Sequence, residues 1–326
     1  MYLIDASIYI FRSYFALPPN WESKDGYSTE AVYGYTRFLI EFISKVSRKA
    51  ENGGKPLVAS AFDESLGSCF RNEIYPDYKC SRALPDEELA FQLQACRDVT
   101  EILGISCFSS ERYEADDLIG SLAQALRCST SYSQEPYSPK HPMCIVTRDK
   151  DLAQLLVHAD DCLWDYADDQ LLFSEDVEKK FGVPPKKIAD YLALVGDSSD
   201  DIPGVPGIGA KTAAAILKDF DHVEDMLDNT ERLSELTVRG AKSLPNKIIE
   251  HGEQVVMAKA LSSIFCEAPL EVGYLDSYEH KYKPFSGCED ISLSQPCWEC
   301  FAEFCEDMGL GPRLLSYAEQ QLKECE

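Results

Sequence analysis

The chain begins Met1-Tyr2-Leu3-Ile4-Asp5, a short apolar run that ends in an aspartate, and the same unit returns twice further along. Residues 57–62 and residues 143–147 are also apolar runs with acidic residues directly after them. Short apolar runs of this kind are typical of buried strands. Because the carboxyl ends of parallel strands meet at one edge of an open sheet, we expect the aspartates at these ends to converge on one cleft. They are Asp5, Asp63, Asp149 and Asp151.

Between these runs, apolar residues return every three or four positions, which predicts helices over 29–46, 87–103 and 115–128. A fourth strand is predicted at 162–164. The alternation predicts an α/β fold, a mostly parallel sheet flanked by helices. We expect this core to span residues 1–173, a mainly helical subdomain to span 174–265, and an acidic extension at 266–326 to pack on the core. The Ser-, Tyr- and Pro-rich stretch 129–142 is predicted to be a surface loop.

Composition narrows the class of protein. The 326 residues include 56 acidic and 31 basic side chains, a net charge of −25, and their 17 Tyr and 15 Phe exclude an acidic disordered chain. No apolar stretch has the length of a membrane span, and the start does not resemble a signal peptide. We therefore expect no membrane partner and a cytoplasmic protein whose 13 cysteines are reduced thiols. Taken alone, the acidity argues against a nucleic-acid partner.

Five further carboxylates stand out, four of them in two pairs whose members are three residues apart. An isolated acid at the start of a helix most often caps it or complements its dipole. Together with the four aspartates that follow the predicted strands, however, these make nine acids that would repel each other unless cations compensate. Oxygen ligands without His or Cys suit Mg²⁺ or Mn²⁺, and two such ions about 4 Å apart promote phosphodiester hydrolysis. The added acids are Glu114, Asp116, Asp117, Asp197 and Asp200.

Residues 202–217 contain glycines in a turn that precedes a predicted helix. Such a turn can be merely structural. However, the order Gly-Val-Pro-Gly-Ile-Gly-Ala-Lys matches a helix-hairpin-helix, whose exposed N–H groups hold a nucleic-acid phosphate backbone without reading bases. The predicted DNA contacts here are Gly204, Gly207, Gly209 and Lys211.

The few basic residues cluster at 71–82. Arg71, Lys79 and Arg82 are interleaved with Tyr75 and Tyr78. A single Lys–Tyr pair is usually a solvated surface pair. The concentration after Asp63 favours phosphate neutralisation together with stacking on a frayed base.

These motifs resemble those of the 5′-3′ exonucleases of the flap endonuclease superfamily, which include the N-terminal nuclease domain of bacterial DNA polymerase I and its stand-alone relatives. The resemblance covers roughly residues 1–265, with no polymerase domain after it. The matching segments, in family order, are 3–5, 61–63, 71–82, 113–117, 147–152 and 196–215.

The resemblance implies a PIN-like fold with a helical arch at about 75–91 and a helix-hairpin-helix subdomain. It implies two Mg²⁺ (or Mn²⁺) ions, one held by Asp5, Asp63, Glu114, Asp116 and Asp117, the other by Asp149, Asp151, Asp197 and Asp200. It also implies that Lys79 contacts the scissile phosphate with Arg71 and Arg82 beside it, and that carbonyls around Val205 and Ile208 hold K⁺. Two departures from the family pattern are Asp201, where Asn is usual, and Cys80-Ser81, where Ala-Asn is common.

The leading hypothesis is a monomeric, structure-specific nuclease that acts on DNA with a free 5′ end, a flap or an overhang, and leaves a 5′-phosphate and a 3′-hydroxyl. The alternatives are a non-catalytic module that binds branched DNA and a ribonuclease of the PIN type, for which RNA–DNA hybrids are possible substrates. Cys297 and Cys300 have the spacing of half a zinc site. The favoured interpretation is that they are ordinary small buried residues of a helix.

Overall fold

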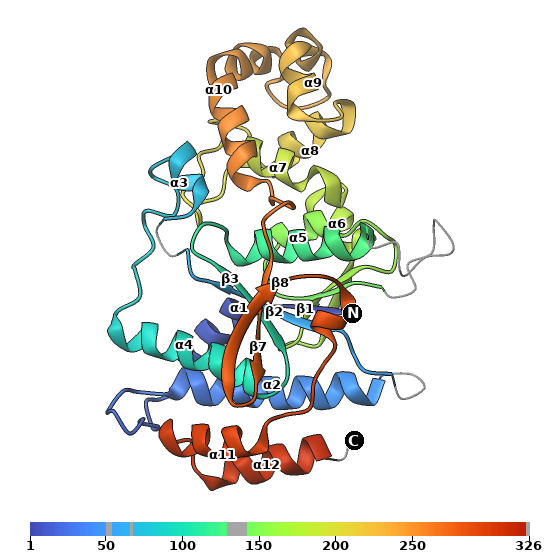
Figure 1. Cartoon of the computed structure of the whole chain (residues 1–326). Coiled ribbons are helices and arrows are strands. Elements are labelled where there is room, and N and C mark those ends of the chain that lie inside the picture. Colours follow the sequence, from blue (N-terminus) through green and yellow to red (C-terminus); the bar gives the residue numbers. More distant parts are fainter. Residues whose placement is uncertain (50–53, 66–67, 129–141, 324–326) are drawn as a thin grey trace. The chain divides into compact units, whose positions relative to one another are not determined.

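The computed structural model describes residues 1–49, 54–65, 68–128 and 142–323 (Figure 1). The loop predicted at 129–142 thus falls, except for Pro142, outside the described residues. The described chain separates into two compact units. Unit 1 comprises Met1–Leu66, Pro85–His141 and Cys266–Glu326, and unit 2 comprises Gly67–Leu84 and Pro142–Phe265.

The strands of unit 1 form a mixed sheet in the order β1-β2-β3-β7-β8. The first three strands are parallel, and β7 and β8 form an antiparallel hairpin that joins at β3. In this register Asp5 lies opposite Ala61, and Asp63 lies opposite Ser110. Both aspartates therefore stand at the carboxyl ends of neighbouring parallel strands. The bounds are β1 Tyr2–Asp5, β2 Val58–Asp63, β3 Ser106–Ser110, β7 Glu271–Asp276 and β8 Glu279–Pro284.

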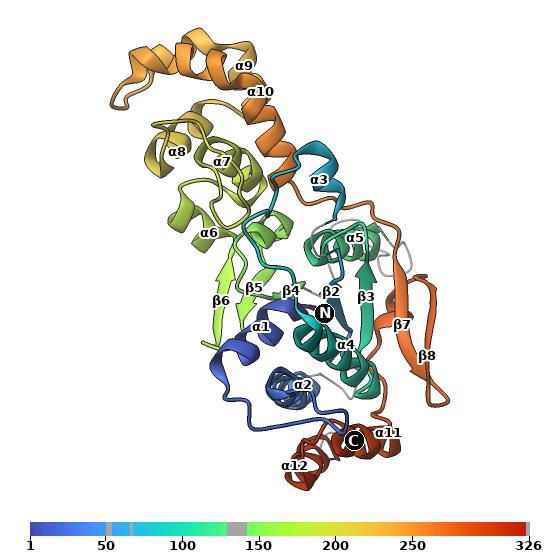
Figure 2. The same ribbon diagram turned by 90° about the vertical axis from the view of Figure 1, so that its left-hand side faces the viewer.

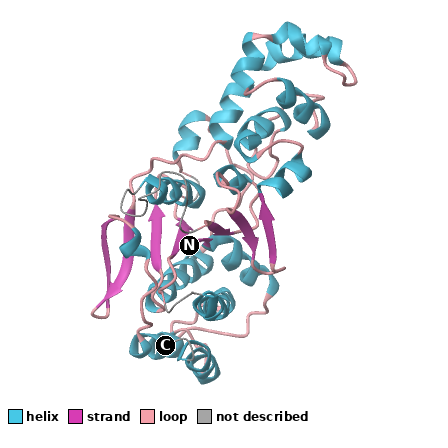
Figure 3. Ribbon diagram, turned by 90° about the vertical axis from the view of Figure 1, so that its right-hand side faces the viewer, coloured by secondary structure: helices cyan, strands magenta, loops and turns pink. Residues whose placement is uncertain are grey.

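Helices cover both faces of this sheet (Figure 3). The crossovers from β1 to β2 and from β2 to β3 advance in the same direction, and right-handed crossovers place α1, α2 and α4 on one face. Helix α5 packs on β1, β2 and β3, and α11 and α12 pack on α4 and α2 (Figures 1 and 2). The bounds are α1 Ala6–Ala16, α2 Glu30–Lys49, α4 Glu87–Ile102, α5 Ala115–Cys128, η7 Cys288–Ile291, α11 Trp298–Asp307 and α12 Pro312–Lys323.

Unit 2 joins three strands to a helical part. β4 Cys144–Val146 pairs in parallel with β5 Cys162–Asp165, which pairs antiparallel with β6 Gln170–Phe173. Beyond β6, the part of the chain that belongs to unit 2 is mainly helical. Its α-helices are α3 Phe70–Ile74, α6 Ser174–Phe181, α7 Ile188–Val195, α8 Ala210–Asp219, α9 Val223–Asp228 and α10 Leu244–Ser262. Its short 3₁₀ helices are η3 Asp151–Leu155, η4 Pro185–Lys187, η5 Thr230–Glu235 and η6 Ala241–Ser243.

The predicted strands and long helices are confirmed, whereas β3, β6 and the β7–β8 hairpin were not predicted. The reason for the omissions is chemical: β3 reads Ser-Cys-Phe-Ser-Ser and β8 is mostly charged and exposed, so neither has an apolar run. The helical arch predicted at 75–91 is only partly helical, because 76–82 form turns, 83–86 have no regular structure and helix α4 starts at Glu87. Pro76, Pro85 and the positive φ of Lys79 (53°) interrupt helical geometry there.

The state of two cysteines also differs from the prediction. Cys297 and Cys300 form a disulfide at the start of α11, and the Cys297 sulfur accepts a hydrogen bond from the Cys300 N–H. They are therefore neither reduced thiols nor ordinary buried residues. Ten other cysteines in the described part of the chain are not in a disulfide. No helix among the described residues combines the length and apolar character needed to cross a membrane.

Candidate metal and phosphate-binding site

In unit 1, five of the predicted metal ligands lie at strand ends and at the start of α5. We call them the strand-end acids: Asp5, Asp63, Glu114, Asp116 and Asp117. Asp63 connects the segments around it, because its Oδ1 accepts a hydrogen bond from Ala115 N (2.7 Å) and its Oδ2 accepts one from Ser7 Oγ (3.1 Å). The end of β2 is thereby tied to the first residues of both α1 and α5.

The burial of these acids is unusual for carboxylates. Asp5, Glu114 and Asp117 are buried, and Asp116 is half-buried. Asp117 Oδ2 accepts from Glu114 N (3.1 Å), which caps the first turn of α5. Capping therefore explains part of the conformation of Asp117. Capping does not explain why Glu114 and Asp5 are buried as well. Each buried carboxylate needs a compensating partner.

In unit 2, four aspartates stand on two loops, and we call them the loop acids: Asp149, Asp151, Asp197 and Asp200. The loop after β4 is held by its own side chains. Asp149 N donates to Thr147 Oγ1 (2.9 Å), and Asp151 N donates to Asp149 Oδ1 (2.8 Å). In the loop after α7, Asp197 and Ile202 exchange backbone hydrogen bonds, so the loop closes on itself.

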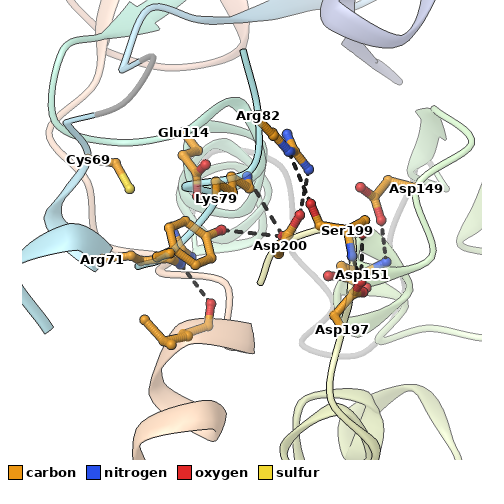
Figure 4. A network of polar contacts seen from close by, with 12 residues as sticks. Cys69, Arg71, Lys79, Arg82, Glu114, Asp149, Asp151, Asp197, Ser199 and Asp200 are labelled. Atoms are coloured by element: carbon orange, nitrogen blue, oxygen red, sulfur yellow. Dashed lines mark hydrogen bonds and ion pairs between the residues drawn. The ribbon is translucent and has the colours of Figure 1, made fainter. Parts of the chain in front are cut away.

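Lys150 links the two loops and was not singled out by sequence reasoning. Its Nζ donates to Asp197 Oδ2 and lies 3.6 Å from Asp151 Oδ1 (Figure 4 shows both aspartates). Burial works to lower the pKa of Lys150, but Asp151 and Asp197 raise it above its usual value. Burial likewise works to raise the pKa of Asp197, but Lys150 and Ser199 lower it. The position of Lys150 between two of the acids in the sequence was the available signal.

Asp151 is the least compensated of the loop acids. It is buried, and its Oδ1 atom accepts no hydrogen bond. Burial and then the nearby Asp149 raise the pKa of Asp151 to about 7, against the opposing effect of Lys150. A buried oxygen without a donor, among other carboxylates, fits the donor set of a hard divalent cation.

The basic cluster of residues 71–82 packs on the second of these loops. Arg82 forms an ion pair with Asp200 Oδ1 at 2.5 Å, and Lys79 Nζ lies 3.8 Å from Asp200 Oδ2. The backbone joins them as well, because Lys79 N donates to Asp200 O (3.0 Å). Asp201, where the family pattern has Asn, accepts from Ser81 N (2.8 Å) and so anchors the same segment. Figure 4 shows Lys79 and Arg82 directed at Asp200.

Arg71 and Tyr78 occupy positions that sequence reasoning did not anticipate. Arg71 is buried, and its guanidinium donates to the carbonyls of Leu261 (2.8 Å) and Ser263 (2.9 Å) at the end of α10. Tyr78 is also buried, with its ring facing Lys79. Both side chains thus hold the segment that carries Lys79 and have little surface for phosphate or base contacts. Tyr75 is half-buried.

The glycine turn has the predicted helix-hairpin-helix form, with α7 before it and α8 after it. Gly204 packs so closely that a Cβ there would lie 2.1 Å from Val195 O, whereas a Cβ at Gly209 would meet nothing within 4 Å. Gly207 has a positive φ of 78°. Lys211, on the first turn of α8, is exposed. The turn therefore combines a rigid base at Gly204 with an accessible N-terminal end of α8.

The side chains of Val205 and Ile208 are buried and fix the hairpin from within. Val205 O accepts from Ile208 N (3.0 Å), and Lys247 Nζ donates to Pro206 O (3.1 Å). A lysine ammonium thus already contacts one hairpin carbonyl. Lys247 is a second residue near the candidate site that the sequence alone did not mark.

Within the described ranges, no group of three or more His, Cys, Asp and Glu side chains is arranged so that it could hold a metal ion. Two of the loop acids, Asp197 and Asp200, instead form ion pairs with Lys150 and Arg82. The assignment of the nine acids as metal ligands stays a prediction. In unit 2 the structure does bring the four predicted aspartates close enough to shift the pKa of Asp151.

A sheet with acids at the ends of its parallel strands and a glycine hairpin between helices are features of nucleases that act on a phosphate backbone. Comparison with known proteins agrees. A family model described as "5'-3' exonuclease, N-terminal resolvase-like domain" matches residues 1–182, and one described as "5'-3' exonuclease, C-terminal SAM fold" matches residues 183–284. The chain belongs to the 5′-3′ exonuclease family and is a nuclease, a hydrolase of phosphodiester bonds.

Individual relatives support the assignment. A 5′-3′ exonuclease of Aquifex aeolicus is 37% identical over 242 residues, which cover 74% of this chain and 77% of that protein. DNA polymerase I of Bacillus subtilis is 34% identical over 273 residues, 83% of this chain but only 28% of the polymerase. The bacteriophage T5 D15 flap endonuclease, solved with DNA and metal ions, has the same fold, with a TM-score of 0.56 and 18% identity over 99% of this chain and 98% of that one.

Proposed function

We propose that this nuclease cleaves DNA with a free 5′ end, at a flap or an overhang, and uses two Mg²⁺ or Mn²⁺ ions held by the nine acids. The observation that carries the proposal is the buried Oδ1 of Asp151, which accepts no hydrogen bond although three other aspartates lie near it. The T5 D15 flap endonuclease of the same fold was solved with metal ions and DNA, which supports both the DNA substrate and the divalent ions.

Each group of residues then has a role set by its position. The strand-end acids and the loop acids hold divalent cations, with Asp63 also fixing the start of α5. When bound, such ions lower the pKa of a water molecule and stabilise the leaving oxygen, which yields a 5′-phosphate and a 3′-hydroxyl. Lys79 and Arg82, now paired with Asp200, exchange that carboxylate for the substrate phosphate and neutralise its charge.

The hairpin binds the duplex backbone through the N–H groups around Gly207 and Gly209 and through the charge of Lys211. We further propose K⁺ binding at the carbonyls near Val205 and Ile208. Lys247, which already donates to Pro206 O, is the competing cation there. If so, Lys247→Met should strengthen the K⁺ dependence of duplex binding, measured in KCl against tetramethylammonium chloride.

The test of the proposed function is cleavage of a 5′-labelled flap DNA in Mg²⁺. The parent should release a fragment with a 3′-hydroxyl. The Asp116→Asn/Asp149→Asn double variant should cleave at least roughly 1,000-fold more slowly, because it loses the metal-assisted stabilisation of the reaction. Asp160→Asn is the matched control, because Asp160 is an exposed aspartate outside the acid groups. If the double variant cleaves as fast as the parent, the assignment of the acids is wrong.

The same experiment separates the alternatives. A matched RNA flap cleaved faster than the DNA flap would favour a PIN-type ribonuclease. Flap binding without cleavage in either Mg²⁺ or Mn²⁺ would favour a non-catalytic module. We also propose that the protein acts as a monomer in the cytoplasm. Ten described cysteines outside a disulfide fit a reducing compartment, although Cys297 and Cys300 are paired.

A further inference from the structure

Unit 1 contains a pocket of about 440 Å³ between α2, the start of α12 and the segment that carries Trp21. Helices α2 and α12 lie side by side in this unit (Figures 1 and 2). The volume is within the range of small-molecule sites. The family models end at residue 284, so the α12 side of the pocket lies beyond the matched region.

The charge of the pocket is opposite to that of the chain. Nine described residues line it, and they include Arg37 and Arg313 but no carboxylate, although the whole chain carries a net charge of −25. Glu41, outside the lining, accepts hydrogen bonds from Arg37 (2.9 Å) and Tyr317 (3.2 Å) and partly neutralises Arg37. Arg313 is exposed, and its guanidinium makes no hydrogen bond or ion pair with any described residue. Arg313 is therefore the group available to an anion.

The remaining lining is aromatic. Trp21 stacks on Tyr33 with ring centroids 4.0 Å apart and an interplanar angle of 16°, and the Tyr317 ring lies 5.4 Å from the Arg37 guanidinium. All three rings are half-buried, so each has some accessible surface. Gly311 adds room, because a Cβ there would meet nothing within 4 Å. Flat rings suit a planar heterocycle, and Arg313 suits a phosphate.

We propose that this pocket binds a nucleoside phosphate, with the base on the aromatic rings and the phosphate on Arg313. A nucleoside phosphate combines a planar base and an anion at the short distance that a pocket of this size permits. Its source is either a free mononucleotide or one residue of a single strand. The proposal does not depend on the metal ligands or on the nuclease reaction.

The experiment is isothermal titration calorimetry with the full chain in EDTA, which removes divalent ions and prevents cleavage. The ligands are thymidine 5′-monophosphate, thymidine, inorganic phosphate and a short thymidine oligonucleotide. We expect the monophosphate or the oligonucleotide to bind at least tenfold more tightly than thymidine or phosphate alone. Arg313→Gln should weaken that binding roughly tenfold through loss of a charge-assisted contact, and Tyr317→Leu should weaken it roughly fivefold or more through loss of stacking.

Lys323→Gln is the matched control, because it removes one exposed positive charge from the same helix outside the pocket. It should leave the affinity within twofold, and thermal melting checks that each variant is folded. If Arg313→Gln weakens binding of the monophosphate alone, the natural ligand is a free mononucleotide. If it weakens binding of the oligonucleotide alone, the ligand is a single strand. The proposal is overturned if neither ligand binds, if inorganic phosphate binds as tightly as the monophosphate, or if Arg313→Gln binds like the parent.

Discussion

The carboxylate of Asp151 is buried, and its Oδ1 atom accepts no hydrogen bond in unit 2. Lys150 Nζ, 3.6 Å from this atom, compensates the buried carboxylate only in part, and an incompletely compensated buried charge lowers stability. Asp151→Asn should therefore melt at the same temperature as the parent or slightly above it in EDTA, with a gain of about 1 kcal/mol at most. It should also lose most of the increase in melting temperature that the parent shows in 10 mM MgCl₂.

Differential scanning fluorimetry with and without MgCl₂ measures both effects. Asp160→Asn serves again as the exposed control and should keep the response of the parent. A variant that melts well below the parent in EDTA yet keeps the full magnesium response would show that Asp151 is a structural residue.

His280 provides a pH-dependent contact in unit 1, away from the candidate ligands. Its Nδ1 forms a hydrogen bond with the buried Glu101, and this bond raises the pKa of His280 above 6.5. Burial opposes the rise, and the charges of Glu101 and Asp98 add to it. Arg97, the other charged group facing it, has a lowering effect. The stabilisation is complete below pH 6.5 and is lost as the pH rises through the raised value.

His280→Gln should consequently be less stable than the parent at pH 6, and the difference should shrink toward pH 9. We expect about 1 kcal/mol or less at pH 6, because the imidazole is 36% exposed and solvent screens the pair. Urea unfolding across this pH range, with the His280→Gln/Glu101→Gln double-mutant cycle, measures the coupling. A difference that grows with pH would contradict the assignment.

At the scale of the element, the hairpin between α7 and α8 depends on Gly204. A Cβ there would lie 2.1 Å from Val195 O and 2.6 Å from Gly196 N, and these main-chain atoms cannot move aside as a flexible side chain could. Gly204→Ala should lower the free energy of unfolding by about 2–4 kcal/mol and weaken duplex binding, because the turn must open. Urea unfolding and a DNA-binding titration measure the two effects.

Gly209→Ala is the matched control in the same hairpin. Its φ is −105° and a Cβ would meet nothing within 4 Å, so stability should change by less than about 1 kcal/mol. Equal losses at the two glycines would show that packing at Gly204 does not determine the hairpin.

Elements also explain which predictions succeeded. α5 was predicted at its observed bounds, because its apolar residues recur at helical spacing and acids mark its start. β3 and the β7–β8 hairpin were missed, because their stability comes from pairing with neighbours distant in the sequence and not from local apolar runs. The predicted helix is absent at 75–86 because Pro76, Pro85 and the positive φ of Lys79 interrupt it. Contacts of Lys79 and Arg82 with Asp200 hold the segment instead.

At the scale of the whole molecule, the net charge of −25 determines how DNA can bind. Under the proposed function, attraction comes from local features, namely Lys79, Arg82, Lys211 and bound divalent ions. With about three cationic contacts, affinity should fall roughly 40-fold between 50 and 200 mM salt. It should fall further in EDTA, because the acid groups then repel phosphate.

Fluorescence anisotropy with a flap DNA, in Ca²⁺ and in EDTA, measures this dependence. Lys211→Gln should reduce the salt slope by about one unit, whereas Lys323→Gln, on α12, should leave it unchanged. Tight binding in EDTA at 200 mM salt would contradict this account.

The sequence alone determined the fold class, the strand ends that carry Asp5 and Asp63, the form of the hairpin and the membership of the family. These properties follow from periodicity, from glycine conformations and from side chains at short spacing, all of which are local. Tertiary structure decided that Arg71 holds the end of α10 and that Lys150 bridges Asp151 and Asp197. It also decided that Trp21, Arg37 and Arg313 meet at one pocket. Except for the neighbours Lys150 and Asp151, these contacts join residues far apart in the chain, so they depend on packing and not on a local pattern.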